Sequence, residues 1–144
     1  MAEVLSRIRS ALFTPGTAAA RLRNAVTAGA DVCIFDLEDS VPPGRVVEAR
    51  ETVRAAIDEL GGRTPIWVRV HPAASHDMPL DLAALPLAKH QCIMLPTAIH
   101  AAHVSAVQSP LAAAEASTQP ALTPFLCIAA AVPNPTPLGR HTGR

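Results

Sequence analysis

Three carboxylates stand within four residues, directly after the apolar run Val32-Cys33-Ile34-Phe35: Asp36, Glu38 and Asp39. The run predicts a buried strand, and α/β proteins keep their chemistry where such strands end. On alternating strand positions Asp36 and Glu38 point to one side, and such a pair suits Mg²⁺, which prefers oxygen ligands. The alternative is structural: Asp39 caps the next turn and Glu38 is solvated. Like charges this close require a cation nearby.

Arg69 is the candidate for that cation. It lies in the segment WVRVHP, at the end of another predicted buried strand. A guanidinium there must be paired, and its fork fits a carboxylate through two hydrogen bonds. Arg69 therefore either balances the acidic cluster or binds an anionic substrate at the same edge, and the two roles are compatible.

The segment Phe13-Thr14-Pro15-Gly16-Thr17 places a glycine and backbone N–H groups at a predicted helix start, with Thr17 as its N-cap. Such a place attracts anions, so Thr14, Pro15 and Gly16 are candidate substrate-binding residues. The segment lacks the lysine of a P-loop and the spacing of a dinucleotide-binding loop, so it does not indicate a nucleotide. The alternative is an ordinary turn between a strand and a helix.

Neither the histidines nor the cysteines indicate a metal site. His100 and His103 are three residues apart on a predicted helix, and His71 follows a strand. No acidic residue is in register with them, so we expect surface positions. The three cysteines form no CxxC pair and lie in apolar runs, which predicts buried thiols. No serine or cysteine lies in a nucleophile elbow, so acyl-enzyme chemistry has no support.

Short apolar runs alternate with helical patterns along the chain. We predict strands at residues 10–13, 32–37, 66–70 and 92–95, and a possible fifth at 125–128. We predict helices at residues 17–29, 42–61, 81–87 and 101–108. This alternation indicates a parallel sheet covered on both faces. It fits either a doubly wound sheet of about five strands, which the length favours, or the first part of a (β/α)₈ barrel, which normally needs about 250 residues.

Composition excludes several classes of partner. The 144 residues carry no formal net charge, which argues against nucleic-acid and membrane-surface binding. No apolar run approaches the roughly 18 residues of a spanning helix, and the first residues lack a signal-peptide pattern, so a cytoplasmic location is expected. Residues 1–131 are predicted to form the folded part, and the proline-rich residues 132–144 a disordered tail.

Five segments together resemble the citrate lyase β-subunit-like group of the HpcH/HpaI aldolase superfamily. They are RSALFTPG (9–16), GADVCIFDLEDSVPP (29–43), AR (49–50), WVRVHP (67–72) and IMLP (93–96). The likeness runs from about residue 10 to 104, and its second segment is quite specific. It implies an α/β fold that is a partial (β/α)₈ barrel with the first four to five βα units, against the length argument.

The resemblance also implies a reaction. Members of this family cleave or form a carbon–carbon bond next to a carbonyl, in a CoA-linked or free hydroxy acid, with Mg²⁺. Arg69 would anchor a substrate carboxylate. Asp36, Glu38 and Asp39 would belong to the network around the metal and its waters, without being its direct ligands. The implied partners are a small acid or acyl-CoA, and further copies of the chain.

The sequence departs from the family pattern where the metal should bind. Thr97 and Ile99 stand where the family has a lysine and a glutamate, and an alanine after residue 128 stands in place of a metal-binding glutamate. No direct metal ligand is therefore assigned, and a truncated chain is expected. Two hypotheses remain: a carbon–carbon lyase with weak or no activity as an isolated chain, or a non-catalytic remnant that binds an acidic ligand or a family partner.

Overall fold

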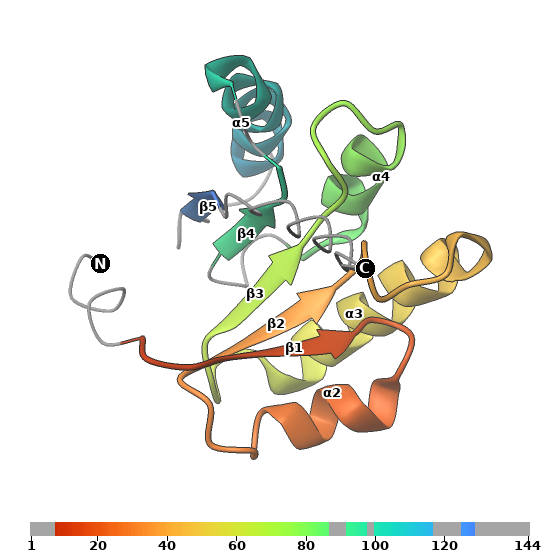
Figure 1. Cartoon of the computed structure of the whole chain (residues 1–144), viewed down its shortest axis with the longest axis vertical. Helices are drawn as coiled ribbons and strands as arrows, with labels where there is room; N and C mark the ends of the chain where they lie inside the picture. The colour runs from red at the N-terminus through yellow and green to blue at the C-terminus, as the bar shows by residue number, and fades with distance from the viewer. Residues whose placement is uncertain (1–7, 87–91, 98–99, 117–124, 129–144) are drawn as a thin grey trace, which may run out of the picture.

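The computed structural model describes residues 8–86, 92–97, 100–116 and 125–128, with side chains as far as residue 108. Five strands alternate with helices (Figure 1). The strands are β1 (Ala11–Pro15), β2 (Val32–Asp36), β3 (Ile66–Arg69), β4 (Cys92–Leu95) and β5 (Phe125–Ile128). The helices are α2 (Ala19–Ala25), the 3₁₀ turn η1 (Pro43–Arg45), α3 (Val46–Leu60), α4 (Asp77–Ala84) and α5 (Ala101–Ala116). The predicted tail at 132–144 lies outside the described residues.

The sheet is parallel throughout, and its strands follow one another in chain order, β1-β2-β3-β4-β5. A doubly wound sheet would reverse direction and place β1 between β2 and β3. Sequential order is instead that of a (β/α)₈ barrel, in which each crossover adds the next strand on the same side. The prediction of a partial barrel of four to five βα units is confirmed.

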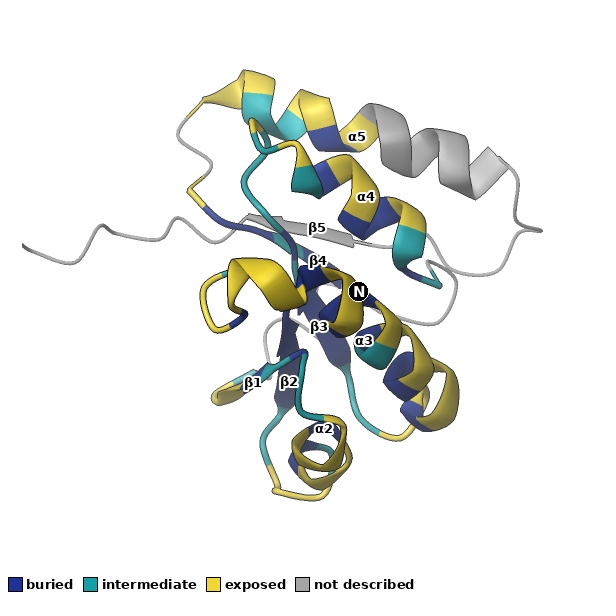
Figure 2. Ribbon diagram, turned by 90° about the vertical axis from the view of Figure 1, so that its right-hand side faces the viewer, coloured by how far each residue is buried: buried dark blue, intermediate teal, exposed yellow. Residues whose placement is uncertain are grey.

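The two faces of the sheet carry different side chains, because successive residues of a strand point to opposite sides. On one face Phe35, Val68 and Ile93 pack under the helices, and the same core contains residues of α2, α3, α4 and α5. The opposite face has a smaller cluster of buried residues: Val32, Ile34, Trp67 and Cys92. The described helices therefore lie on one face only (Figures 1 and 2), as in a barrel wall.

Helix α3 follows from its apolar spacing. Its buried residues recur every three or four positions: Val46, Ala49, Arg50, Val53, Ala56, Ile57 and Leu60. This spacing directs one stripe toward the sheet. The helix ends at Leu60 with Gly61 as its C-cap, and Gly62 follows at φ +89°, a conformation that favours glycine. The predicted start at 42–43 is about one turn too early, because residues 43–45 form a 3₁₀ turn and the α-helix begins at Val46.

Two other predicted helix starts are wrong. Thr17 is not an N-cap: α2 begins at Ala19, and its cap residue Ala18 makes no side-chain cap hydrogen bond. Helix α4 begins at Asp77, four residues before the predicted start, because Pro79 lies in its first turn, where a missing N–H does no harm. None of the described helices is long and apolar enough to cross a membrane.

Gly16 lies where β1 meets β2 and α3. A Cβ atom at this position would lie 2.7 Å from the backbone oxygen of Asp36, 3.0 Å from Cγ2 of Val53 and 3.2 Å from Cβ of Ala49. The first contact is with backbone and cannot be relieved by turning a side chain. Glycine is therefore required here by close approach.

Replacing Gly16 by Ala should lower the free energy of unfolding by about 1–3 kcal/mol, because the added methyl group forces the sheet and α3 apart. Urea denaturation followed by circular dichroism measures this. Gly44→Ala is the matched control, since nothing lies within 4 Å of its added Cβ. Equal stability of the two variants would contradict the close approach.

Candidate functional site

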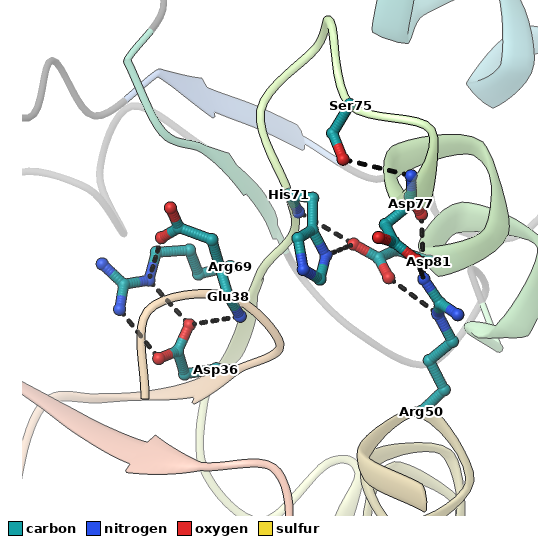
Figure 3. Close-up of polar contacts among 8 residues, drawn as sticks. All are labelled: Asp36, Glu38, Arg50, Arg69, His71, Ser75, Asp77 and Asp81. Atoms are coloured by element: carbon teal, nitrogen blue, oxygen red, sulfur yellow. Dashed lines mark hydrogen bonds and ion pairs between the residues drawn. The ribbon is translucent and has the colours of Figure 1, made fainter. Parts of the chain in front are cut away.

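Asp36 and Arg69 are the last residues of β2 and β3, and they are register partners in the sheet. Nε of Arg69 donates to Oδ1 of Asp36 at 2.7 Å and Nη2 donates to Oδ2 at 2.8 Å (Figure 3). Asp36 is buried and the Arg69 side chain is 18% exposed. The pair is a two-point, charge-assisted contact at the carboxyl edge of the sheet. The prediction that a cation balances the acidic cluster is confirmed.

The carboxylate oxygens of Asp36 also accept hydrogen bonds from the turn that follows β2. Oδ1 accepts the backbone N–H of Glu38 at 3.0 Å, and Oδ2 accepts the backbone N–H of Ser40 at 2.9 Å and the Ser40 hydroxyl. This is the local bonding typical of an Asx turn. Asp36, not Asp39, thus caps the turn, and the Asp39 side chain is 81% exposed. With five donors on two oxygens, Asp36 has no lone pair suited to a metal ion.

The net charge of the site is negative. Oε2 of Glu38 lies 3.5 Å from Nε of Arg69, and Oδ2 of Asp39 lies 3.8 Å from Nη2. Burial alone would raise the pKa of Asp36, but hydrogen bonds from Arg69 and Ser40 outweigh it and hold that pKa below its usual range. The hydrogen bonds to Asp36 raise the pKa of Arg69. Three carboxylates around one guanidinium give a formal charge of −2.

Phe13 supports Arg69 from β1. The guanidinium carbon lies 4.8 Å from the centroid of the Phe13 ring, within the range of a cation–π contact. Phe13 is 47% exposed, which is unusual for a residue of its size. The guanidinium is therefore held both by Asp36 and by the aromatic ring, and Nη1 has no hydrogen-bond partner among the described residues.

The turn after β1 is built as a strand–helix connection. The N–H of Gly16 donates to the backbone oxygen of Asp36 at 2.8 Å, and the N–H of Ala18 donates to that of Pro15 at 3.2 Å. Thr14 is buried. The Gly16 amide is therefore occupied, which favours the turn over an anion cradle. Substrate binding by Thr14, Pro15 and Gly16 stays a prediction.

A second polar network lies beside this site and was missed by sequence reasoning. Asp81, in α4, is fully buried and accepts from Nε of Arg50 at 2.8 Å. Nδ1 of His71 lies 2.7 Å from the other oxygen of Asp81 (Figure 3). The expectation that His71 is a surface residue without an acidic partner is wrong. An arginine on the buried face of a helix, at Arg50, was the available signal, because a buried guanidinium requires an acid.

The described residues do not assemble a direct metal shell. They contain no group of three or more His, Cys, Asp or Glu side chains that could hold an ion. Cys33 and Cys92 are buried cysteines outside any disulfide, as predicted. Thr97, two residues after the end of β4, has φ 49°, a left-handed conformation that is strained for a β-branched residue. Ile99 and the alanines after residue 128 lie outside the described residues.

Comparison with known proteins decides the family. The model for HpcH/HpaI aldolase/citrate lyase matches residues 9–132. The chain belongs to this family. A (3S)-malyl-CoA thioesterase of Cereibacter sphaeroides is 34% identical over 109 residues, which cover 74% of this chain and 38% of the relative. The chain thus spans less than half the length of the curated relatives it matches.

Similar solved structures belong to the same family. The citrate lyase β subunit of Mycobacterium tuberculosis in complex with oxaloacetate and magnesium has a TM-score of 0.56 and 33% identity, covering 70% of this chain and 44% of that one. The CitE protein of the same organism with magnesium, acetoacetate and coenzyme A has a TM-score of 0.55 and 32% identity, covering 68% and 36%. The family resemblance predicted from the sequence is confirmed.

Replacing Asp36 by Asn should lower the free energy of unfolding at pH 7 by about 3 kcal/mol, because Arg69 then loses its buried, two-point counter-charge and keeps only the longer contacts to Glu38 and Asp39. The pKa of Asp36 is lower in the folded chain than in the unfolded one. Its stabilisation is therefore full above the ordinary carboxyl pKa of about 4 and is lost as the pH falls through the folded pKa.

Urea denaturation at neutral and acidic pH measures both effects, and the difference between the Asp36→Asn variant and the unaltered chain should shrink in acid. Asp39→Asn is the matched control, since Asp39 belongs to the same turn and contacts the same arginine but is exposed. It should change stability by less than about 1 kcal/mol. An equal loss in both variants would show that burial of the pair is not the cause.

Proposed function

We propose that this chain is the acid-binding part of a carbon–carbon lyase of the citrate lyase β type. The substrate class is a CoA-linked or free hydroxy acid, cleaved by a retro-aldol or retro-Claisen reaction. The observation that carries the proposal is the fixed guanidinium of Arg69 at the carboxyl edge of the sheet, where barrel enzymes bind their substrates. The proposal concerns residues of a chain that covers 38% of its curated relatives.

Arg69 anchors a substrate carboxylate in this proposal. Asp36 accepts hydrogen bonds from Nε and Nη2, and the Phe13 ring covers one face of the guanidinium. Nη1 is left to contact a ligand. A side chain fixed before binding loses little conformational freedom when the ligand arrives. Asp36 acts on Arg69 and not on the ligand, so it is a positioning residue. Glu38, Asp39 and the turn at Thr14, Pro15 and Gly16 form the surroundings of the bound acid.

Mg²⁺ is proposed on family likeness, because two solved relatives contain it. The described residues do not fit its direct shell, since Asp36 is saturated and no third ligand is near. The formal charge of −2 nevertheless repels a negatively charged acid ligand unless a cation binds with it. Binding of an acid should therefore be stronger in the presence of Mg²⁺.

A cytoplasmic location and assembly with further copies stay predictions.

A second reaction is favoured by the curated relatives, which are named as malyl-CoA thioesterases. The two reactions differ in what happens to the thioester. Cleavage of the carbon–carbon bond of malyl-CoA yields acetyl-CoA and glyoxylate, whereas hydrolysis releases free CoA and malate. A thiol-reactive dye detects CoA only in the second case. A chain that yields neither product but binds acids would be the non-catalytic remnant.

Replacing Arg69 by Lys should weaken oxaloacetate binding about 10- to 100-fold, since lysine keeps the charge but loses the fork that Asp36 and Phe13 hold. Isothermal titration calorimetry with and without Mg²⁺ measures this, with circular dichroism to check folding. Arg45→Lys is the control, because Arg45 is an exposed arginine that pairs with Glu48 on the surface. Unchanged affinity of a folded Arg69→Lys variant would remove Arg69 from the site.

A further inference from the structure

His71 lies close to the Arg69 site, and the function proposed above does not use it. It follows β3 two residues after Arg69. Two residues of extended chain span about 7 Å, so both side chains leave the backbone from the same small region of the sheet edge. Figure 3 shows His71 between the Asp36–Arg69 pair and the Arg50–Asp81 pair. One small ligand could reach both side chains.

Asp81 fixes the orientation of the imidazole ring. Its Oδ2 accepts the backbone N–H of His71 at 2.8 Å and lies 2.7 Å from Nδ1. Its Oδ1 accepts from Nε of Arg50 at 2.8 Å. A carboxylate paired with arginine can only accept, so Nδ1 carries a proton. Nε2, on the other side of the ring, has no hydrogen-bond partner among the described residues.

The imidazole is not needed to join β3 to α4. The backbone N–H of His71 already bonds to Asp81, and Arg50 already joins α3 to α4 through Asp81 and through Oδ1 of Asp77 at 2.6 Å. The additional bond from Nδ1 sets only the direction of the ring. The His71 side chain is 15% exposed, so the ring is not closed off from solvent. A histidine aligned by a buried acid in this way is a feature of ligand-contacting sites.

We propose that Nε2 of His71 makes a second contact with the acid that Arg69 binds, and that Asp81 is its positioning residue. This rests on the proposed function. Arg69 takes a carboxylate, and Nε2 takes a second oxygen: the ring accepts from a hydroxyl when neutral and donates to a keto oxygen when protonated. The ligand class is thus an acid with a hydroxyl or keto oxygen near the carboxylate. An acid without that oxygen leaves Nε2 unpartnered.

Malate and succinate test this directly, because they differ by one hydroxyl group. Calorimetry on the full chain with Mg²⁺ should give about tenfold tighter binding of malate. In ¹⁵N-histidine spectra of the chain, Nδ1 of His71 should show the shift of a protonated nitrogen, and malate but not succinate should move the Nε2 resonance. A purely structural histidine would leave Nε2 unmoved by either acid.

His71→Asn is the informative variant, since the asparagine amide can occupy the place of Nδ1 and keep the bond to Asp81 while Nε2 is lost. It should bind malate and succinate equally. His103→Asn, on α5 outside the network, should retain the tenfold preference. Retention of the preference by His71→Asn, or an unprotonated Nδ1, overturns the proposal.

The outcome for Arg69→Lys separates the two proposals. If this variant weakens both acids while His71→Asn keeps the preference for malate, the role of His71 is wrong and that of Arg69 stands. If Arg69→Lys leaves both affinities unchanged, the proposed acid-binding function is wrong. Absence of binding of either acid to the unaltered chain overturns both.

Discussion

The Asp36–Arg69 pair is the interaction on which the carboxyl edge of this sheet depends. One carboxylate binds the guanidinium of β3 and the N–H groups of the turn after β2, and the backbone oxygen of the same residue accepts the N–H of Gly16 after β1. Three consecutive strand ends are thus joined at one residue. Two charges removed from water are tolerated because their contact is bidentate and the remaining acceptor sites are used. Loss of Arg69 would leave the Asp36 carboxylate buried without a counter-charge, and loss of Asp36 would leave Arg69 only its longer contacts to Glu38 and Asp39.

The same saturation limits the chemistry of the site. An aspartate that orients an arginine through both oxygens cannot also offer them to a metal ion, and the neighbouring acids Glu38 and Asp39 are left without a third ligand among the described residues. Arg69 is thereby fixed in an environment of negative charge. This arrangement suits recognition of an acid that arrives with a cation.

The strands and the charge pair were predictable because both are local or follow from register. Continuous apolar runs marked the strands, and polar residues at the ends of adjacent parallel strands must meet. The Asp81–His71 contact was not predictable in this way. A helix placed at residues 81–87 puts Asp81 at its start, whereas the observed start at Asp77 turns Asp81 inward beside Met78 and Leu82. The role of Gly16 was missed because a close approach between elements leaves no mark in the local sequence.

The two side chains proposed to meet the ligand are fixed by two different elements. Arg69 is held by Asp36 of β2, and His71 is held by Asp81 of α4, which packs in the helical layer. Their separation is thus set by how β3 lies against β2 and against α4, and not by a flexible loop. A change in that packing would alter the distance between the two ligand contacts even with every site residue intact. Because a misplacement of about 1 Å can cost a site most of its effect, recognition here depends on the core beneath the edge as much as on the edge itself.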